Sequence, residues 1–203
     1  MDMPSASDAS TLEFYQTNAP SYIGARPDEV SPDLLAFLPH VPAGARILEL
    51  GCGGGSDALA MERLGYRVDA TDGVAAMAAI ANERLSHGAR TMRFDQLNAT
   101  AEYDAVVACA SLLHVPAKEL PVVLRRIHEA LTAEGWHFAS FKTGGSPGWD
   151  QHGRYYNYPD EDDMEAAYRS AGHWARLAFE TYDGVGYFSE PARWLTVTAQ
   201  KSG

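Results

Sequence analysis

Apolar runs and helical periodicities alternate along the middle of the chain. The apolar runs predict buried strands at 46–50, 66–71, 103–116 (where the strand opens into a loop) and 135–142. Three helices are predicted between or after these strands. Helix-compatible residues fill 56–64, and apolar residues recur at helical spacing from Val74 to Leu85. A further helix is predicted from Pro116, followed by an apolar stripe from Leu120 to Leu131. This alternation of strands and helices predicts a parallel sheet.

The pattern changes after residue 142. A helix is predicted from about Asp160 to Ala171, because Gly172 follows it as a typical helix-ending glycine. Two further strands are predicted, at about 173–182 and 191–199. With no repeat or linker along 203 residues, we predict a single domain over residues 1–203, with flexible residues 1–10.

A glycine cluster follows the first predicted strand, in the segment ILELGCGGGSD at 47–57. Glycines allow a tight turn with positive φ angles and let a ligand approach the backbone closely. A phosphate loop would need Lys and Ser or Thr after the last glycine, and the dinucleotide pattern would need a glycine at 56, where the chain has Ser56. An acid at the strand end, Glu49, repels a pyrophosphate, so the segment favours a cationic ligand.

A second acid, Asp72, ends the second predicted strand, 21 residues beyond Gly51. A carboxylate at this place can accept hydrogen bonds from both hydroxyls of a ribose. Aspartate is also a preferred N-cap, so Asp72 as a cap for the helix at Val74 is the alternative.

These segments together resemble the class I S-adenosylmethionine-dependent methyltransferases, and within them small-molecule enzymes of the tellurite and thiopurine methyltransferase type. The resemblance implies an α/β fold: a Rossmann-like, doubly wound sheet of seven strands, mostly parallel, with a C-terminal antiparallel hairpin. It also implies S-adenosylmethionine as cofactor, which carries a sulfonium and an ammonium but no phosphate. The implied activity is methyl transfer to a small molecule by in-line displacement.

The resemblance also implies the cofactor-binding residues. The glycine turn would contact the amino acid part of the cofactor, and residues 91–97 would form the third strand and adenine site. Asp95 as a solvated turn residue and Met77 as core are the alternatives. The N-terminal cap at 11–40 would close over the cofactor. The predicted contacts are Tyr15, Tyr22, Arg26, Glu49, Gly51, Cys52, Gly53, Asp72, Gly73, Met77, Asp95, Gln96, Leu97, Ala110 and Ser111.

The acceptor side is predicted from two regions that follow the fourth and fifth strands. His114 is the candidate base, because imidazole can take up a proton near neutral pH; a structural histidine is the alternative. The loop at 143–160 is long and rich in aromatic residues, and its GRYYNYPDE portion resembles a substrate-lining stretch of the family, which makes Arg154 and Tyr155 candidates. An aromatic surface excursion is the alternative, and Lys142 or Arg154 could hold an anionic acceptor.

Composition narrows the partners. A net charge of −11 without a basic run argues against nucleic acid, and no apolar run reaches the ~20 residues of a membrane helix. The polar start lacks the apolar core of a signal peptide, so we expect a cytoplasmic monomer or homodimer with reduced cysteines at Cys52 and Cys109 and no metal. The alternatives are a protein that binds S-adenosylmethionine without turnover, a tRNA-modifying methyltransferase, and an NAD-dependent dehydrogenase, which Ser56 argues against.

Overall fold

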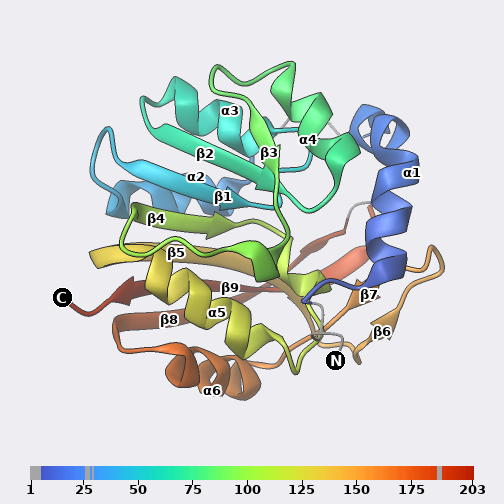
Figure 1. Cartoon of the computed structure of the whole chain (residues 1–203). Helices are drawn as coiled ribbons and strands as arrows, with labels where there is room; N and C mark the ends of the chain where they lie inside the picture. Colours follow the sequence, from blue (N-terminus) through green and yellow to red (C-terminus); the bar gives the residue numbers. More distant parts are fainter. Residues whose placement is uncertain (1–5, 26–27, 29, 187–188) are drawn as a thin grey trace.

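The computed structural model describes residues 6–25, 28, 30–186 and 189–203. One seven-stranded sheet runs through the molecule in the order β3-β2-β1-β4-β5-β9-β8 (Figure 1). Five strands are parallel, and β9 pairs antiparallel with both β5 and β8. The strands are β1 Arg46–Leu50, β2 Arg67–Asp72, β3 Ala89–Thr91, β4 Tyr103–Ala108, β5 Leu131–Thr143, β8 Trp174–Val185 and β9 Pro191–Lys201.

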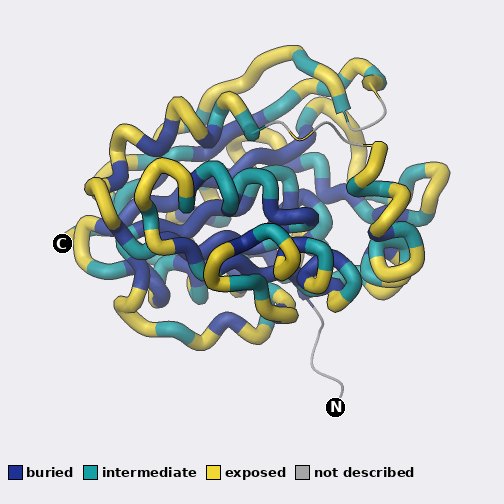
Figure 2. Tube along the Cα trace, turned by 90° about the horizontal axis from the view of Figure 1, so that it is seen from above, coloured by how far each residue is buried: buried dark blue, intermediate teal, exposed yellow. Residues whose placement is uncertain are grey.

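Helices cover both faces of this sheet. Side chains alternate along β1 and β4, so that Ile47 and Val107 face one core cluster while Leu48 and Val106 face the other. The first cluster packs under α2, α3 and α4, and the second packs against α5 and α6, on the opposite face in Figure 1. The helices are α1 Ala9–Ala25, α2 Pro32–Phe37, α3 Ser56–Arg63, α4 Ala75–Asn82, α5 Leu120–Ala130 and α6 Glu161–Ala171, with short 3-10 turns η1 Leu38–His40, η2 Phe94–Gln96 and η3 Leu112–His114. In Figure 2 the buried segments run through the centre of the molecule, and β1, β4 and β5 supply most of the buried strand residues.

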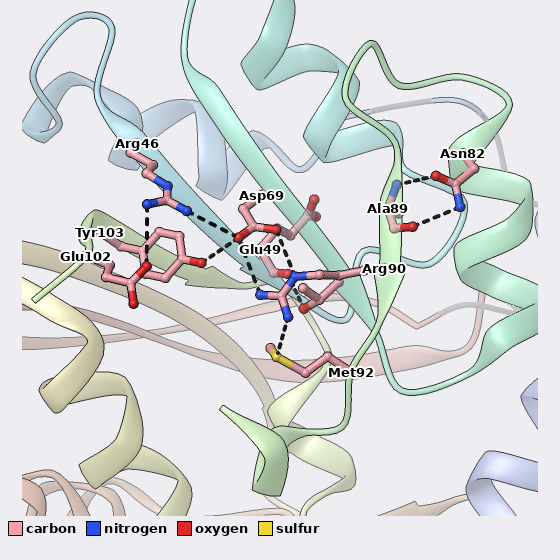
Figure 3. Close-up of polar contacts among 10 residues, drawn as sticks. Arg46, Glu49, Asp69, Asn82, Ala89, Arg90, Met92, Glu102 and Tyr103 are labelled. Atoms are coloured by element: carbon pink, nitrogen blue, oxygen red, sulfur yellow. Dashed lines mark hydrogen bonds and ion pairs between the residues drawn. The ribbon is translucent and has the colours of Figure 1, made fainter. Parts of the chain in front are cut away.

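An ionic network fastens the β3 side of the sheet (Figure 3). The Asp69 carboxylate on β2 accepts hydrogen bonds from the Tyr103 hydroxyl at 2.5 Å and from the Arg90 guanidinium at 3.1 Å, while Arg46 lies at 3.8 Å. Asn82 adds a two-way hydrogen bond to the backbone of Ala89. Four strands are therefore joined by side chains in addition to their backbone ladder.

This architecture confirms the predicted fold class. Several element boundaries differ from the predictions. The third strand ends at Thr91, and 94–96 form η2 instead, because the Gln96 side chain accepts the Arg93 amide and closes a tight turn. The helix predicted from Pro116 begins only at Leu120, after a turn in which the Glu119 amide donates to the Pro116 carbonyl.

The other differences lie in β5, the 143–160 loop and the N-terminus. Leu131, predicted on the helix, is the first residue of β5. The loop at 143–160 contains a small hairpin, β6 Gly148–Trp149 and β7 Tyr155–Tyr156. Of residues 1–10, which were predicted to be flexible, 1–5 lie outside the described residues. Ala6 is buried, and Asp8 accepts the Thr11 amide at 2.9 Å at the start of α1. In the described part of the chain, no helix is long and apolar enough to cross a membrane.

A buried histidine on β5 makes folding sensitive to acid. His137 lies between the sheet and α6, with its ring stacked on Tyr168. Its Nδ1 bonds the Val106 carbonyl at 2.8 Å, while its Nε2 has no partner among the described residues. Burial lowers the pKa of His137 to about 4, so the folded protein holds the ring neutral.

We expect the stability of the protein to fall as pH drops from about 6.5 to about 4, because the unfolded chain protonates His137 and the folded protein does not. In His137→Gln this contribution is absent. As pH drops, the free energy of unfolding of this variant should therefore fall less steeply than that of the unchanged protein. The difference in slope should reach up to about 1.4 kcal/mol per pH unit. Urea unfolding of both proteins across this pH window measures the difference, and equal slopes would contradict it.

Candidate active site

The turn after β1 is built around glycines with positive φ. Gly51 has φ +81° and Gly53 has φ +53°, and the amides of Gly51 and Cys52 both donate to the Thr71 carbonyl at the end of β2. A Cβ on Gly51 would lie 2.4 Å from the Cβ of Ser111, so the turn after β4 fills the space that a side chain would need. Gly53 instead has open space beside it, with only Ile23 at 4.0 Å. The turn therefore presents bare backbone to a cavity.

Two acids at the ends of β1 and β2 flank this turn. The Asp72 carboxylate accepts the Gly53 amide at 2.9 Å and the Val74 amide at 2.8 Å. The helix α4 has Val74 as its N-cap, without a side-chain bond, so Asp72 joins two loops instead of capping the helix. Burial raises the pKa of Asp72 to about 6, although both amide bonds act to lower it.

Glu49 is 2% exposed and points its carboxylate toward the same cavity. No donor in the described part of the chain reaches its Oε2. Burial raises the pKa of Glu49 well above its usual range, and the charges of Asp57 and Asp72 raise it further. A buried carboxylate without a partner is unfavourable, and a cation placed beside it would remove the penalty.

The cavity has a volume of about 630 Å³, within the roughly 300–1,000 Å³ range of small-molecule sites. Its lining residues include the carboxyl ends of β1 and β2 and the turn after β4, and α1 contributes further lining residues. In Figure 1, α1 lies beside that end of the sheet. Twelve of the predicted site residues meet in its wall: Tyr15, Tyr22, Glu49, Gly51, Cys52, Gly53, Asp72, Gly73, Met77, Ala110, Ser111 and His114.

His114 is held between α1 and the 143–160 loop. Its Nδ1 lies 2.5 Å from the Tyr155 carbonyl, which can only accept, so Nδ1 carries the proton. Its Nε2 therefore accepts from the Tyr15 hydroxyl, at 3.0 Å. Burial lowers the pKa of His114 to about 4 and raises the pKa of Tyr15 to about 12, so both groups are neutral near pH 7.

The remaining predicted acceptor residues lie behind this pair. Arg154 is buried, bonds Asp150 at 2.7 Å, and has its guanidinium over the rings of Phe14 and Tyr156. Tyr155 contributes its carbonyl to His114, while its ring packs edge-on against Trp149. Neither residue belongs to the described cavity wall.

Three predicted adenine contacts are placed apart from the wall. Asp95, Gln96 and Leu97 lie in or beside η2, where Asp95 bonds Arg93 at 3.3 Å and Leu97 is buried in the core. Their neighbours Arg93 and Phe94 line the cavity instead. Arg26 lies outside the described residues.

The structure also brings residues to the cavity that sequence reasoning missed. Ser140 comes from β5, Trp194 from β9, and Tyr182 and Val185 from β8, while Asp33 comes from α2. The Tyr182 hydroxyl donates to the Asp33 carboxylate, which joins the β8–β9 hairpin to the N-terminal cap. The aromatic residues in the last two predicted strands could have indicated a contribution to the site. The register in which the two strands pair decides which of these residues reach the cavity.

The fold and the cavity define an α/β protein with a pocket beside the glycine turn that follows its first strand. The sequence matches the family described as "Methyltransferase domain" over residues 22–191. The chain belongs to this family. The predicted family and the predicted methyltransferase class of enzyme are thereby confirmed.

Solved structures share the fold. The 1,6-didemethyltoxoflavin-N1-methyltransferase of Burkholderia thailandensis, solved with 1,6-didemethyltoxoflavin and S-adenosylhomocysteine, is 22% identical with a TM-score of 0.74, over 100% of this chain and 94% of that one. Phosphoethanolamine N-methyltransferase 2 of Haemonchus contortus, solved with phosphomonomethylethanolamine and S-adenosylhomocysteine, is 16% identical with a TM-score of 0.76, over 97% and 61%. TehB from Haemophilus influenzae is 15% identical with a TM-score of 0.68, over 85% and 63%. No curated protein matches the sequence.

The close approach at Gly51 yields a stability prediction. In Gly51→Ala, the new Cβ meets Ser111 at 2.4 Å in a left-handed conformation, whereas Gly44→Ala has φ +72° and open space around its Cβ. Both variants should lose about 1–2 kcal/mol to backbone strain, and Gly51→Ala should lose about 1–3 kcal/mol more to the collision. Urea unfolding compares the two variants, and equal losses would show that the two turns do not pack as described.

Proposed function

We propose that the protein transfers the methyl group of S-adenosylmethionine to a small-molecule acceptor. The observation that carries this proposal is the buried carboxylate of Glu49, which lacks a described partner beside the open turn at Gly53. The family match supports methyl transfer, and the Burkholderia and Haemonchus enzymes bind S-adenosylhomocysteine in the same fold.

The residues present fit this cofactor. Glu49 offers a carboxylate to the ammonium of its amino acid part, and that cation would relieve the repulsion from Asp57 and Asp72. Each oxygen of Asp72 holds one backbone amide and keeps a lone pair for a ribose hydroxyl. The apolar side chain of Met77 lines the cavity beyond Asp72, as an adenine ring requires.

S-adenosylmethionine supplies an electrophilic methyl carbon, to which the acceptor forms a bond as the carbon–sulfur bond breaks and its electron pair stays on sulfur. The protein positions the two molecules and excludes water, which is the main requirement of such a displacement. Tyr15 and Tyr22 on α1 supply that cover, with their rings packed edge-to-face at 5.1 Å.

Tyr15 and His114 form a route for the acceptor proton. As the acceptor becomes positively charged, its proton can pass to the Tyr15 oxygen while the Tyr15 proton moves to Nε2 of His114. The carbonyl of Tyr155 holds the imidazole in the receiving tautomer. Arg154 lies behind this pair, where its charge helps to keep the His114 imidazole neutral and therefore able to accept the proton.

We also infer from the sequence that the protein is cytoplasmic and acts as a monomer or homodimer. Size-exclusion chromatography with light scattering tests the oligomeric state.

Glu49→Gln tests the cofactor site. We expect S-adenosylmethionine and S-adenosylhomocysteine to bind at least about tenfold more weakly in calorimetry, because a charge-assisted hydrogen bond contributes about 1.5–3 kcal/mol. The melting temperature without ligand should rise, since the variant removes a buried charge. Glu102→Gln, an exposed acid at the far end of the sheet, should change neither quantity. Unchanged affinity in Glu49→Gln would contradict the assignment of Glu49.

Turnover is tested with methyl-labelled S-adenosylmethionine and a fractionated cell extract. We expect label in the small-molecule fraction and not in RNA or protein. Tyr15→Phe should lower the labelling rate by about 10²-fold or more while cofactor affinity stays within about threefold, because the variant removes the proton route and keeps the ring. Cofactor binding without any transfer would favour a binding protein, and label in tRNA would favour an RNA-modifying enzyme.

A further inference from the structure

The order of strands separates the cavity into two halves. The glycine turn, Asp72 and Met77 belong to β1, β2 and α4, on one side of β4. Ser140, Trp194 and Tyr182 belong to β5, β9 and β8, on the other side of β4. Since the proposed cofactor contacts occupy the first half, the wall over β5, β9 and β8 is left for the acceptor.

The acceptor half presents aromatic surface with one carboxylate. The Trp194 indole nitrogen donates to the Val185 carbonyl at 3.2 Å, and the Tyr182 hydroxyl donates to Oδ2 of Asp33. The polar atoms of both rings are thus bound within the protein, and what the two side chains offer a ligand is ring surface. Asp33 also lines the cavity, and the Tyr182 hydroxyl engages Oδ2 of its carboxylate.

The charge of the wall is strongly one-sided. Among the described residues that line it, six are acidic: Asp8, Asp28, Asp33, Glu49, Asp57 and Asp72. The basic ones are Arg84, which lies 2.6 Å from Asp28, and Arg93, which lies 3.3 Å from Asp95.

The cations expected to hold an anionic acceptor are engaged elsewhere. Lys142 on β5 is buried and lies 2.7 Å from Glu190, with its ammonium over the rings of Tyr156 and Trp194. Arg154 is bound to Asp150. Neither belongs to the described cavity wall, and both already face a carboxylate, so an anion in the acceptor half would meet a wall in which acids outnumber bases.

We infer that the acceptor is an uncharged or cationic aromatic compound, and that carboxylates, oxyanions and phosphate esters are rejected. The inference rests on the proposed function and names the substrate class of the same site. Stacking on Trp194 and Tyr182 holds the ring, and Asp33 favours a positive or N–H-bearing substituent. Rejection of anions follows from like-charge repulsion in a partly desolvated site.

A matched set of probes tests the inference: 3-methylindole is neutral, tryptamine is cationic and indole-3-propionate is anionic, on one ring. Each is titrated by calorimetry into the protein saturated with S-adenosylhomocysteine, which lacks the sulfonium charge. We expect the neutral and cationic probes to bind at least about tenfold more tightly than the anionic one. Failure of S-adenosylhomocysteine itself to bind would refute the proposed function and is observed before any probe is added.

Variants assign the preference to residues. Asp33→Asn should weaken the binding of tryptamine about tenfold and change the affinity for 3-methylindole by no more than about twofold, because only the charge is removed. Asp183→Asn, next to Tyr182 but not in the described wall, is the matched control and should change neither probe. Trp194→Leu should weaken both probes while S-adenosylhomocysteine still binds. Equal or tighter binding of indole-3-propionate, or no binding by any probe, would overturn the inference.

Discussion

The turn after β1 and the turn after β4 meet at one contact, where Gly51 has no side chain and Ser111 occupies the space. The Ser111 hydroxyl donates to the Leu50 carbonyl at 2.6 Å, which fastens the two turns across the top of the sheet. The preceding residue, Ala110, has a positive φ of 48°, and its backbone amide donates a hydrogen bond to the Ser140 hydroxyl on β5. The 3-10 turn that carries His114 follows directly. The position of His114 therefore depends on a glycine more than 60 residues earlier in the chain.

A second constraint is the burial of acids at the ends of β1 and β2. Glu49 and Asp72 are both buried, and both have pKa values raised by that burial, so each destabilises the protein when ionised. Asp72 is compensated by two amides, whereas Glu49 is not compensated in the described part of the chain. Such an arrangement favours binding of a cation, because the cation would supply the partner for the Glu49 carboxylate that the described residues do not provide.

Much of the fold follows from local signals in the sequence. The strand at 46–50, the glycine turn and the helix ended by Gly172 are set by periodicity and backbone preference, which act within a few residues. The start of α5 could not be placed in this way, because Pro116 fits a helical first turn equally well, whereas in the structure it begins a separate turn before the helix. The residues after Thr91 form η2 because of a side-chain bond from Gln96, which a strand pattern does not reveal.

The same reasoning explains which site residues were predictable. Residues at the ends of β1, β2 and β4 were found because the carboxyl ends of parallel strands lie at one edge of the sheet, whatever the order of the strands. Trp194 and Tyr182 are directly paired across β9 and β8, and the composition of these two strands does not reveal that pairing register. The loop at 143–160 acts on the site through the Tyr155 carbonyl and through Asn157, whose side chain donates to the carbonyls of Leu112 and Val115 on either side of His114. Contacts to backbone atoms cannot be predicted from residue types. The half of the cavity at the glycine turn could therefore be predicted from the sequence, whereas the other half depends on how the C-terminal strands and this loop pack.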